Sequence, residues 1–282
     1  MSKIVISADS TVDLSEELVE KFHVNIIPLY VTLGEKTLKD TVEIKADDIY
    51  DFVSKTKQLP KTSACSIDDY RQLFNKLTKE GNAVIHFNIA SGMSSTHQNA
   101  LIAAQEVDGE VYVVDSANLS TGIAHLVIDT YNLINEGKSA AEVYEEVKKR
   151  ISKVRASFVV DKLEYLRMGG RCSSVALLGA NVLQIKPCIE VVDGVMGVAS
   201  KYRGPYKKVI LQYVDDKLTK TENIKKDKIF VTHTKCDREI VDAVIKKVKE
   251  YNMFENIYET EAGCVVTSHC GPSTLGILFE VE

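Results

Sequence analysis

The feature that most constrains the fold of this chain is a change of pattern near residue 156. Before that point, short runs rich in β-branched residues alternate with amphipathic stretches whose apolar residues recur every three to four positions. The expected strands are Lys3–Ala8, Val24–Leu33, Ala83–Phe87 and Val111–Asp115. The expected helices are Ser15–Phe22, Ser66–Lys79, Ser94–Glu106, Leu119–Asn135 and Ser139–Lys153. Strands separated by helices of this length indicate βαβ units, and so a mostly parallel, doubly wound α/β sheet.

After residue 156 the strands follow one another with fewer intervening helices. The expected strands there are Ala156–Val160, Val182–Val192, Val195–Ser200, Lys228–Thr234, Asn256–Glu259 and Gly263–His269. Asp193-Gly194 separates two of them and is a strong signal for a tight hairpin turn. Only Gly204–Thr221 and Arg238–Tyr251 resemble long helices. We therefore expect an α/β domain over residues 1–155, an α+β domain with antiparallel hairpins over residues 156–282, and a ligand site between them.

The composition narrows the class of protein. With 45% apolar and 27% charged residues, the chain has the material for a core and no bias toward disorder. No apolar run reaches the roughly 18–20 residues that cross a bilayer, and the segment from Met1 to Asp9 fits a buried strand better than a signal peptide. We expect a cytoplasmic protein that is not a membrane protein. The 35 Lys and Arg against 40 Asp and Glu give a net charge of −5, which disfavours nucleic acid as a partner.

Polar clusters rich in hydroxyl groups follow several of the expected elements. They are Asp9-Ser10-Thr11, Thr62-Ser63, the run from Ser91 to Thr96, and Asp115-Ser116. Ligands of open α/β sheets gather outside the carboxyl ends of the strands, where helix-start N–H groups and hydroxyls bind carboxylate or phosphate. Each single cluster is better explained as a helix cap, which Ser, Thr and Asp favour. Several clusters at one sheet edge, however, favour an anion site.

Two arginines and a histidine in the second half are further candidates. Arg171 follows the glycine turn Gly169-Gly170, and Arg203 precedes Gly204. Arginine suits bidentate contact with carboxylate or phosphoryl oxygens, although either side chain is equally explained by pairing with surface acids. His269 lies at the end of an expected strand, where it can donate to a carboxylate or act as a general base. A structural histidine is the common alternative, and it is the interpretation that we prefer for His233.

Several motifs that define other functions are missing from the sequence. Neither G-x-G-x-x-G nor G-x-x-x-x-G-K-[ST] occurs, so no nucleotide cofactor is expected, and Ser91-Gly92-Met93-Ser94 is not the G-x-S-x-G of hydrolases. No spacing of His, Asp, Glu or Cys predicts a metal site, and we read the six scattered cysteines as small buried side chains. The apolar runs Leu101–Ala104 and Val175–Ala180 fit a core, or equally the wall of a tunnel.

Taken together and in order, these segments resemble the DegV family, the bacterial fatty-acid-binding proteins that act as the carrier subunit of fatty acid kinase. The resemblance runs nearly from end to end. It rests on the opening Asp9-Ser10-Thr11-Val12-Asp13-Leu14, Thr62-Ser63, Ser91 to Thr96, Leu163-x-x-Leu166-x-x-Gly169-Gly170-Arg171, Ile185-Lys186-Pro187, Asp193-Gly194, Lys201-Tyr202-Arg203-Gly204 and His269-x-Gly271-Pro272. The chain departs from the family pattern at Ala90, Ser95, His97 and Ser273.

The resemblance implies a function in lipid binding rather than catalysis. Carried over by position, the ligands of a fatty-acid carboxylate are Thr62, Ser94 and His269, with Ser63 and Ser95 near the head group and the acyl chain in a buried apolar tunnel. Arg171 and Arg203 are expected at the mouth, facing the ATP-dependent kinase subunit that converts the acid to an acyl phosphate for phospholipid metabolism. No metal, cofactor or catalytic residue is implied for this chain, and the bound fatty acid is its ligand.

Two other functions remain open at this stage. Ser94 as nucleophile and His269 as base describe a serine-dependent acyl hydrolase or transferase, although the sequence offers no third, orienting acid. The arginines and the helix-start serines also suit a binding protein for a small polar metabolite. The residues alone do not decide between these alternatives.

Overall fold

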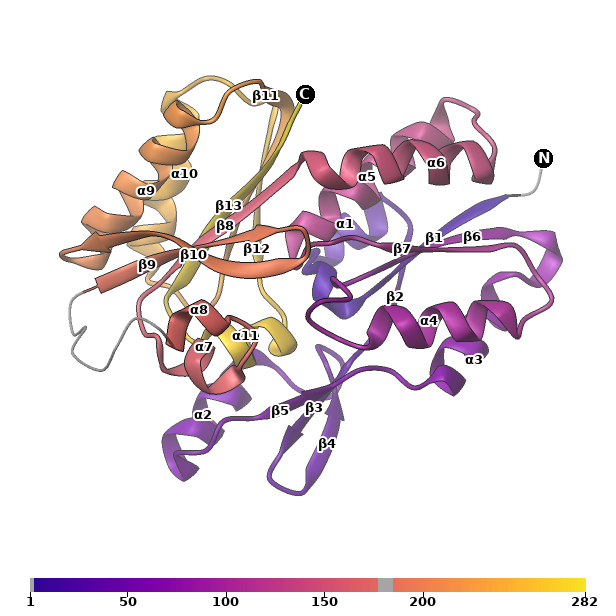
Figure 1. Cartoon of the computed structure of the whole chain (residues 1–282), viewed down its shortest axis with the longest axis horizontal. Helices are drawn as coiled ribbons and strands as arrows, with labels where there is room; N and C mark the ends of the chain where they lie inside the picture. The colour runs from indigo at the N-terminus through magenta and orange to yellow at the C-terminus, as the bar shows by residue number, and fades with distance from the viewer. Residues whose placement is uncertain (1–2, 177–184) are drawn as a thin grey trace.

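The computed structural model describes residues 3–176 and 185–282, and its first half is built around a parallel sheet (Figure 1). Strands β1 (Ile4–Asp9), β2 (Val24–Ile27), β6 (Ala83–Asn88) and β7 (Val111–Asp115) pair in the order β2-β1-β6-β7, all parallel. Helices lie on both faces of this sheet, as the alternation of strands and helices predicts. The predicted α/β fold class is confirmed.

The helices divide between the two faces of the parallel sheet. On one face are α1 (Glu16–Lys21), α5 (Thr121–Asn135) and α6 (Ala140–Arg150); on the other are α3 (Ile67–Leu77) and α4 (Thr96–Gln105). Capping boxes are present at Ser66-x-x-Asp69 and Ser139-x-x-Glu142, where two of the expected helices begin. Short 3₁₀ turns occupy Ser10–Val12, Lys79–Gly81 and Ile151–Lys153.

A small antiparallel sheet is inserted between β2 and α3. It contains β3 (Tyr30–Leu33), β4 (Lys36–Lys39) and β5 (Lys61–Ser63) in the order β4-β3-β5, with α2 (Ala46–Thr56) between its last two strands. The prediction of one long strand over Val24–Leu33 was therefore wrong. The chain leaves the parallel sheet at Pro28, which has no N–H to donate, and the Leu29 amide donates instead to Ser10 Oγ at 3.1 Å.

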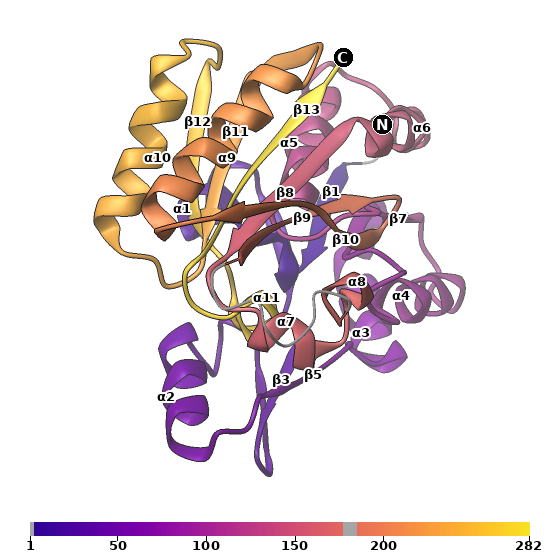
Figure 2. The same ribbon diagram turned by 60° about the vertical axis from the view of Figure 1, so that its left-hand side comes forward.

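The second half forms a six-stranded mixed sheet (Figure 2). Its strands are β8 (Val154–Val160), β9 (Ile185–Val192), β10 (Val195–Arg203), β11 (Ile224–His233), β12 (Asn256–Glu261) and β13 (Thr274–Val281), in the order β10-β9-β8-β13-β11-β12. All pairs are antiparallel except β11–β12. The predicted hairpin at Asp193-Gly194 is confirmed, and both residues have the positive φ that its tight turn requires.

Helices also cover both faces of the six-stranded sheet. Helices α9 (Tyr206–Lys220) and α10 (Arg238–Glu250) pack on the outer face and enclose a second hydrophobic core with residues such as Val231 and Ile277. Helix α5 contacts β8 and β13 on the inner face and also β1 and β6 of the parallel sheet. One hydrophobic core therefore continues from Phe87 through Leu126 to Phe158.

Three short helices lie at the end of the six-stranded sheet that faces β5. They are α7 (Glu164–Gly169), α8 (Ser173–Ala176) and α11 (Cys264–Cys270). The predicted strand Gly263–His269 was wrong, because these residues form α11, and the strand of this region is β13, which the sequence did not reveal. The β-branched pair Val265-Val266 favours a strand locally, but contacts to the helix start from distant carboxylates decide otherwise.

Two predictions fall partly on residues that the structure does not describe. Residues 182–184 of the expected strand Val182–Val192, and residues 177–180 of the apolar run Val175–Ala180, lie outside the described ranges. The division into domains at residue 155 stays a prediction. In residues 3–176 and 185–282, no helix combines the length and the apolar character that crossing a membrane requires.

Candidate functional site

A cavity of about 310 Å³ opens where the carboxyl edge of the parallel sheet meets β5, the β9–β10 hairpin and α11. Its lining residues come from segments that are far apart in the sequence: Leu29, Thr62, Ser63, Ala64, Ile89, Met93, Ser94, Ser95, Leu119, Arg171, Met196, Val265, Val266, His269 and Cys270. Ile89 directly follows β6, so the cavity lies at the sheet edge where α/β proteins bind their ligands.

The lining changes in character from the mouth inward. Ser63, Ser95 and Arg171 are exposed at the rim, and Thr62, Ser94 and His269 are half-buried behind them. The innermost lining is apolar and buried: Leu29, Ile89, Met93, Leu119, Met196, Val265 and Cys270. Burial raises the pKa of the Cys270 thiol to about 12, so this side chain is neutral. A molecule with one polar end and one apolar end matches this order.

Thr62 and His269 form the centre of the polar end. Thr62 lies on β5 opposite Val31 of β3, and its Oγ1 is 2.8 Å from Nε2 of His269 on α11. These residues are 207 positions apart in the sequence. The sequence placed His269 at the end of a strand, whereas it lies in the last turn of a helix.

Ser94 is held in a turn immediately before α4. Its Oγ is 2.6 Å from Thr96 Oγ1 and accepts a hydrogen bond from the Thr96 amide at 3.2 Å. The Ser91 amide, in turn, donates to Asp115 Oδ1 at 3.2 Å, which fastens the same turn to the end of β7. Ser94 therefore accepts from a helix-start amide and lines the cavity at the same time. The two interpretations of its cluster, a helix cap and a part of a binding site, are compatible.

The His269 imidazole is neutral at neutral pH. Burial, with a smaller contribution from the Arg171 charge, lowers its pKa to about 4. Its Nδ1 is buried and has no hydrogen-bond partner among the described residues. A Cβ on Gly169 would lie 2.6 Å from this Nδ1, which explains why a glycine precedes Gly170 and Arg171. With Nδ1 unpartnered, the tautomer that carries its proton on Nε2 presents that proton to Thr62 and the cavity.

The two arginines differ in position. Arg171 lines the mouth, with its Nη1 donating to the Gly169 carbonyl at 3.0 Å. Arg203 is exposed at the end of β10 and is not part of the lining. Neither forms an ion pair with a carboxylate among residues 3–176 and 185–282, so pairing with surface acids does not account for them.

The geometry of a hydrolase is not found in the described part of the chain. Ser94 Oγ bonds to Thr96 rather than to His269, and no carboxylate orients His269 Nδ1. A serine nucleophile needs a base within hydrogen-bond reach, and that base needs an orienting group.

The apolar walls include residues that the sequence did not identify. Leu29, Met93, Leu119, Met196 and Val265 are such residues, and no local pattern distinguishes them from ordinary core residues. A second apolar hollow of about 30 Å³ shares Leu119, Val266 and Cys270 with the cavity and is also lined by Phe158 and Leu278. The run Leu101–Ala104 does not line either space, and its Leu101, Ala103 and Ala104 pack in the core that α3, α4 and the sheet share.

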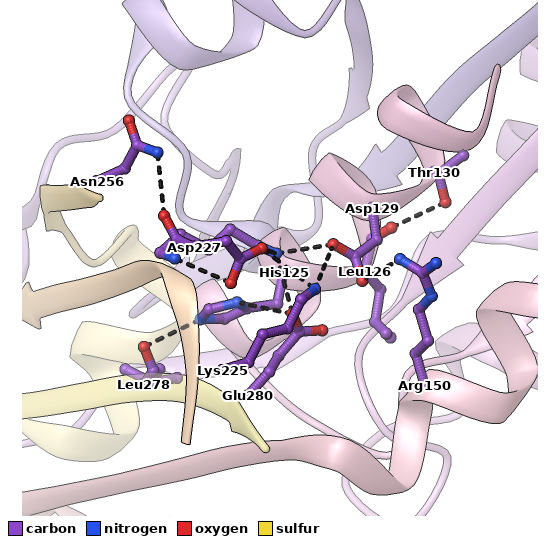
Figure 3. Close-up of polar contacts among 11 residues, drawn as sticks. His125, Leu126, Asp129, Thr130, Arg150, Lys225, Asp227, Asn256, Leu278 and Glu280 are labelled. Carbon is purple, nitrogen blue, oxygen red and sulfur yellow. Dashed lines mark hydrogen bonds and ion pairs between the residues drawn. The ribbon is translucent and has the colours of Figure 1, made fainter. Parts of the chain in front are cut away.

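Three carboxylates that no sequence spacing had suggested meet beside α5: Asp129, Asp227 and Glu280 (Figure 3). Each could offer a metal one oxygen, but Lys228 Nζ already lies 2.7 Å from Asp129, 2.8 Å from Asp227 and 2.9 Å from Glu280. Lys225 and Arg150 add two more cations to the group. Three positive charges thus balance three negative ones, so we read this group as a buried ion cluster.

Comparison with known proteins gives matches over nearly the whole chain. The family model described as "Uncharacterised protein, DegV family" matches residues 3–282. A DegV domain-containing protein of Clostridium acetobutylicum is 33% identical over 99% of both chains, and a protein of Thermotoga maritima named "Fatty acid-binding protein" is 29% identical over 99% of this chain and 98% of its own. The solved structure "Fatty Acid Binding of a DegV family Protein from Thermus thermophilus" has a TM-score of 0.91 at 29% identity, covering 99% of this chain and 100% of that one.

Proposed function

This chain belongs to the DegV family, and we propose that it binds a long-chain fatty acid, with the carboxylate among Thr62, Ser94 and His269. The observation that carries the proposal is the order of the cavity lining, from hydroxyls and an imidazole at the half-buried end to apolar side chains inside. Similar proteins from Thermotoga maritima and Thermus thermophilus are named for fatty acid binding.

The polar end suits a carboxylate for a physical reason. An unpartnered carboxylate in a half-buried position costs several kcal/mol, so it requires dedicated donors. The Thr62 and Ser94 hydroxyls and the Nε2–H of His269 supply three neutral donors. The carboxylate takes the place of the Thr62–His269 hydrogen bond of 2.8 Å, since both groups can turn toward it.

The acyl chain supplies most of the binding free energy. Each buried CH₂ contributes about 0.8 kcal/mol, so a chain of about 15 methylenes gains roughly 12 kcal/mol before the costs of ordering. We propose that the chain runs from His269 past Leu119, Val266 and Cys270 into the second hollow, which Phe158 and Leu278 also line.

We further propose that the protein presents this carboxylate to an ATP-dependent kinase partner in the cytoplasm and is not itself a catalyst. The carboxylate oxygen attacks the γ-phosphorus of ATP, forming the acyl phosphate bond as the bond to ADP breaks. Two features support this step: the sequence has no P-loop of its own, and Arg171 is exposed beside the mouth, where it can contact phosphoryl oxygens. Arg203 is our second candidate for the partner surface.

Mass spectrometry tests the lipid proposal directly. Protein purified without added lipid is examined under native and then denaturing conditions, and delipidated protein is titrated with palmitate. We expect one non-covalently bound fatty acid per chain, and binding that saturates at one equivalent. A chain that carries no fatty acid and takes up none on addition would refute the proposal. The same titration of a Ser139→Ala protein, which lacks a helix cap far from the cavity, shows whether general destabilisation alone changes palmitate binding.

A further inference from the structure

We propose that Asp13 and Asp40 are positioning residues for the fatty-acid site, because they fix the start of α11 and thereby the place of His269. The inference rests on the proposed function, but the contacts that support it all lie within this chain. Asp13 belongs to the opening motif Asp9-Ser10-Thr11-Val12-Asp13, and neither aspartate lines the cavity.

The start of α11 has no cap of its own. Its N-cap residue is Gly263, which has no side chain to accept the free amides of the first turn. The Gly263 amide donates to Asp13 Oδ1 at 2.8 Å, and the Cys264 amide donates to Asp40 Oδ1 at 2.8 Å. Two carboxylates more than 200 residues away in the sequence thus cap this helix.

Both carboxylates are themselves held in place. Asp13 follows the 3₁₀ turn after β1 and accepts from the Ser120 hydroxyl, while Asp40 follows β4 and accepts from Ser10 Oγ at 2.7 Å. Asp13 is 5% exposed and Asp40 is fully buried. In each side chain Oδ1 accepts from α11 and Oδ2 accepts from a serine on the side of the parallel sheet, which makes the helix start a fixed point.

Gly263 leaves no free space between the helix and the two acids. A Cβ at this position would lie 3.2 Å from Asp13 Oδ1, 3.2 Å from Thr41 Cγ2 and 3.4 Å from Asp40 Oδ1. The two separations of 3.2 Å are tighter than nearly all real Cβ contacts, so a side chain at this position would require its neighbours to shift by a few tenths of an ångström.

The position of the helix start determines the position of His269. His269 lies six positions after Gly263, a rise of about 9 Å along a helix. At that far end, His269 Nε2 contacts Thr62 Oγ1 at 2.8 Å. The helix is thus tied at both ends, and a displacement at Gly263 is transmitted through one short rigid element to the imidazole.

The same motif also supports the opposite wall of the cavity. Asp9 Oδ2 accepts from the Ile89 amide at 2.8 Å, at the beginning of the segment that leads to Ser94. Ser10 Oγ accepts from the amide of Leu29, a lining residue, at 3.1 Å. The opening motif therefore contacts the segments that carry the lining residues without contributing a lining residue itself.

The test combines paired substitutions with two readouts. Asp13→Ala and Asp40→Ala remove the acceptor, whereas Asp13→Asn and Asp40→Asn keep an acceptor oxygen at nearly unchanged volume. In ligand-free protein, the NMR resonances of the His269 ring report its environment; in delipidated protein, palmitate titration gives the Kd. We expect each alanine variant to shift the His269 resonances and to weaken palmitate binding about tenfold or more, and each asparagine variant to recover most of both.

The control is Glu142→Ala, which removes a carboxylate that accepts from the Ser139 amide at the start of α6 and is expected to lower stability without moving His269. Gly263→Ala provides a milder change if the alanine variants do not fold. Folded Asp13→Ala, Asp40→Ala or Gly263→Ala protein with unchanged His269 resonances would overturn the inference. If wild-type protein fails to bind palmitate, the proposed function fails, and the His269 resonances still decide the positioning role.

Discussion

Replacing Lys228 by Met should destabilise the protein strongly, because Lys228 is the central cation of the buried ion cluster. Its side chain is 3% exposed, and its Nζ contacts carboxylate oxygens of Asp129, Asp227 and Glu280 within 2.7–2.9 Å. Lys225 and Arg150 contribute the other two positive charges. The substitution retains most of the side-chain volume, so it changes the charge of the cluster from balanced to −1 with little change in packing.

The expected loss is about 3–5 kcal/mol, the range found when one partner of a buried ion pair is removed. The gross attraction of a single pair about 3 Å apart is about 5–6 kcal/mol at an effective dielectric constant of about 20. Most of that attraction offsets the desolvation of the charges, so the loss reflects the carboxylate left without its cation. Against a total stability of about 5–15 kcal/mol, this is a large fraction.

The pH dependence provides a second signature of the same substitution. In the wild type, the neighbouring cations hold the pKa of Asp129 below its usual range despite burial. Without Lys228, the excess carboxylate has a folded-state pKa above its unfolded value and binds a proton more readily when folded. Its destabilising effect is therefore greatest above the folded pKa and shrinks as the pH falls through it. The loss should be smaller at pH 5 than at pH 7.

Urea denaturation followed by far-UV circular dichroism measures both effects, since the chain has no Trp. Lys207→Met removes an exposed ion pair with Glu239, and we expect this control to change stability by less than about 1 kcal/mol. Lys228→Met/Glu280→Gln restores the charge balance and should recover part of the loss. A Lys228→Met protein within about 1 kcal/mol of the wild type at pH 7 would refute this account of the cluster.

Three further outcomes are expected. Ser94→Ala and His269→Ala should each weaken palmitate binding by about 1–3 kcal/mol, measured by titration of delipidated protein, because each removes one donor to the carboxylate; an unchanged Kd for both would exclude them as ligands. Arg171→Ala should leave lipid retention intact and slow acyl phosphate formation by the partner kinase, and loss of bound lipid would place Arg171 in the lipid site instead. Burial lowers the pKa of His125 to about 3 from 6.5, so the unfolded chain binds more protons below pH 6.5 and the free energy of unfolding falls as the pH falls. In urea denaturation, His125→Gln should reduce this pH slope by about 1.4 kcal/mol per pH unit between pH 6 and 4. An unchanged slope would show that His125 is protonated in the folded protein.

The parts of the fold that the sequence predicts correctly are those determined locally. The capping boxes at Ser66 and Ser139 join residues three positions apart, and the turn at Asp193-Gly194 requires positive φ at both positions. A local pattern contains these features in full, so the elements around them form where it predicts. The βαβ alternation is of the same kind, because periodicity within each segment is sufficient to reveal it.

The failures occur where distant groups decide the conformation. Val265-Val266 has a strand-like composition, yet Asp13 and Asp40 cap these residues into a helix. The same holds for the carboxylate site, since Thr62 and His269 are 207 positions apart and no spacing rule predicts their contact. The resemblance to a known family identified Thr62 and His269 together as ligands of one carboxylate. The physical argument for each residue taken separately did not join them in one site. The apolar wall of the cavity is still harder to predict, because a Leu119 or Met196 that lines a pocket looks the same in the sequence as one that packs in a core.

Polar side chains along one face of α5 explain how the cavity can be formed before its ligand arrives. Thr121 Oγ1 lies 2.6 Å from Thr232 Oγ1, His125 Nε2 lies 3.0 Å from the Leu278 carbonyl, and Asp129 Oδ1 lies 2.7 Å from Lys228 Nζ. These contacts repeat every four residues and join α5 to the six-stranded sheet in one register, because sliding by a residue would leave buried polar groups unpartnered. A single register fixes the two sheets relative to each other, and with them β5 and α11. The binding free energy of the acyl chain is then not needed to bring Thr62 and His269 together, which lowers the cost of binding a flexible ligand.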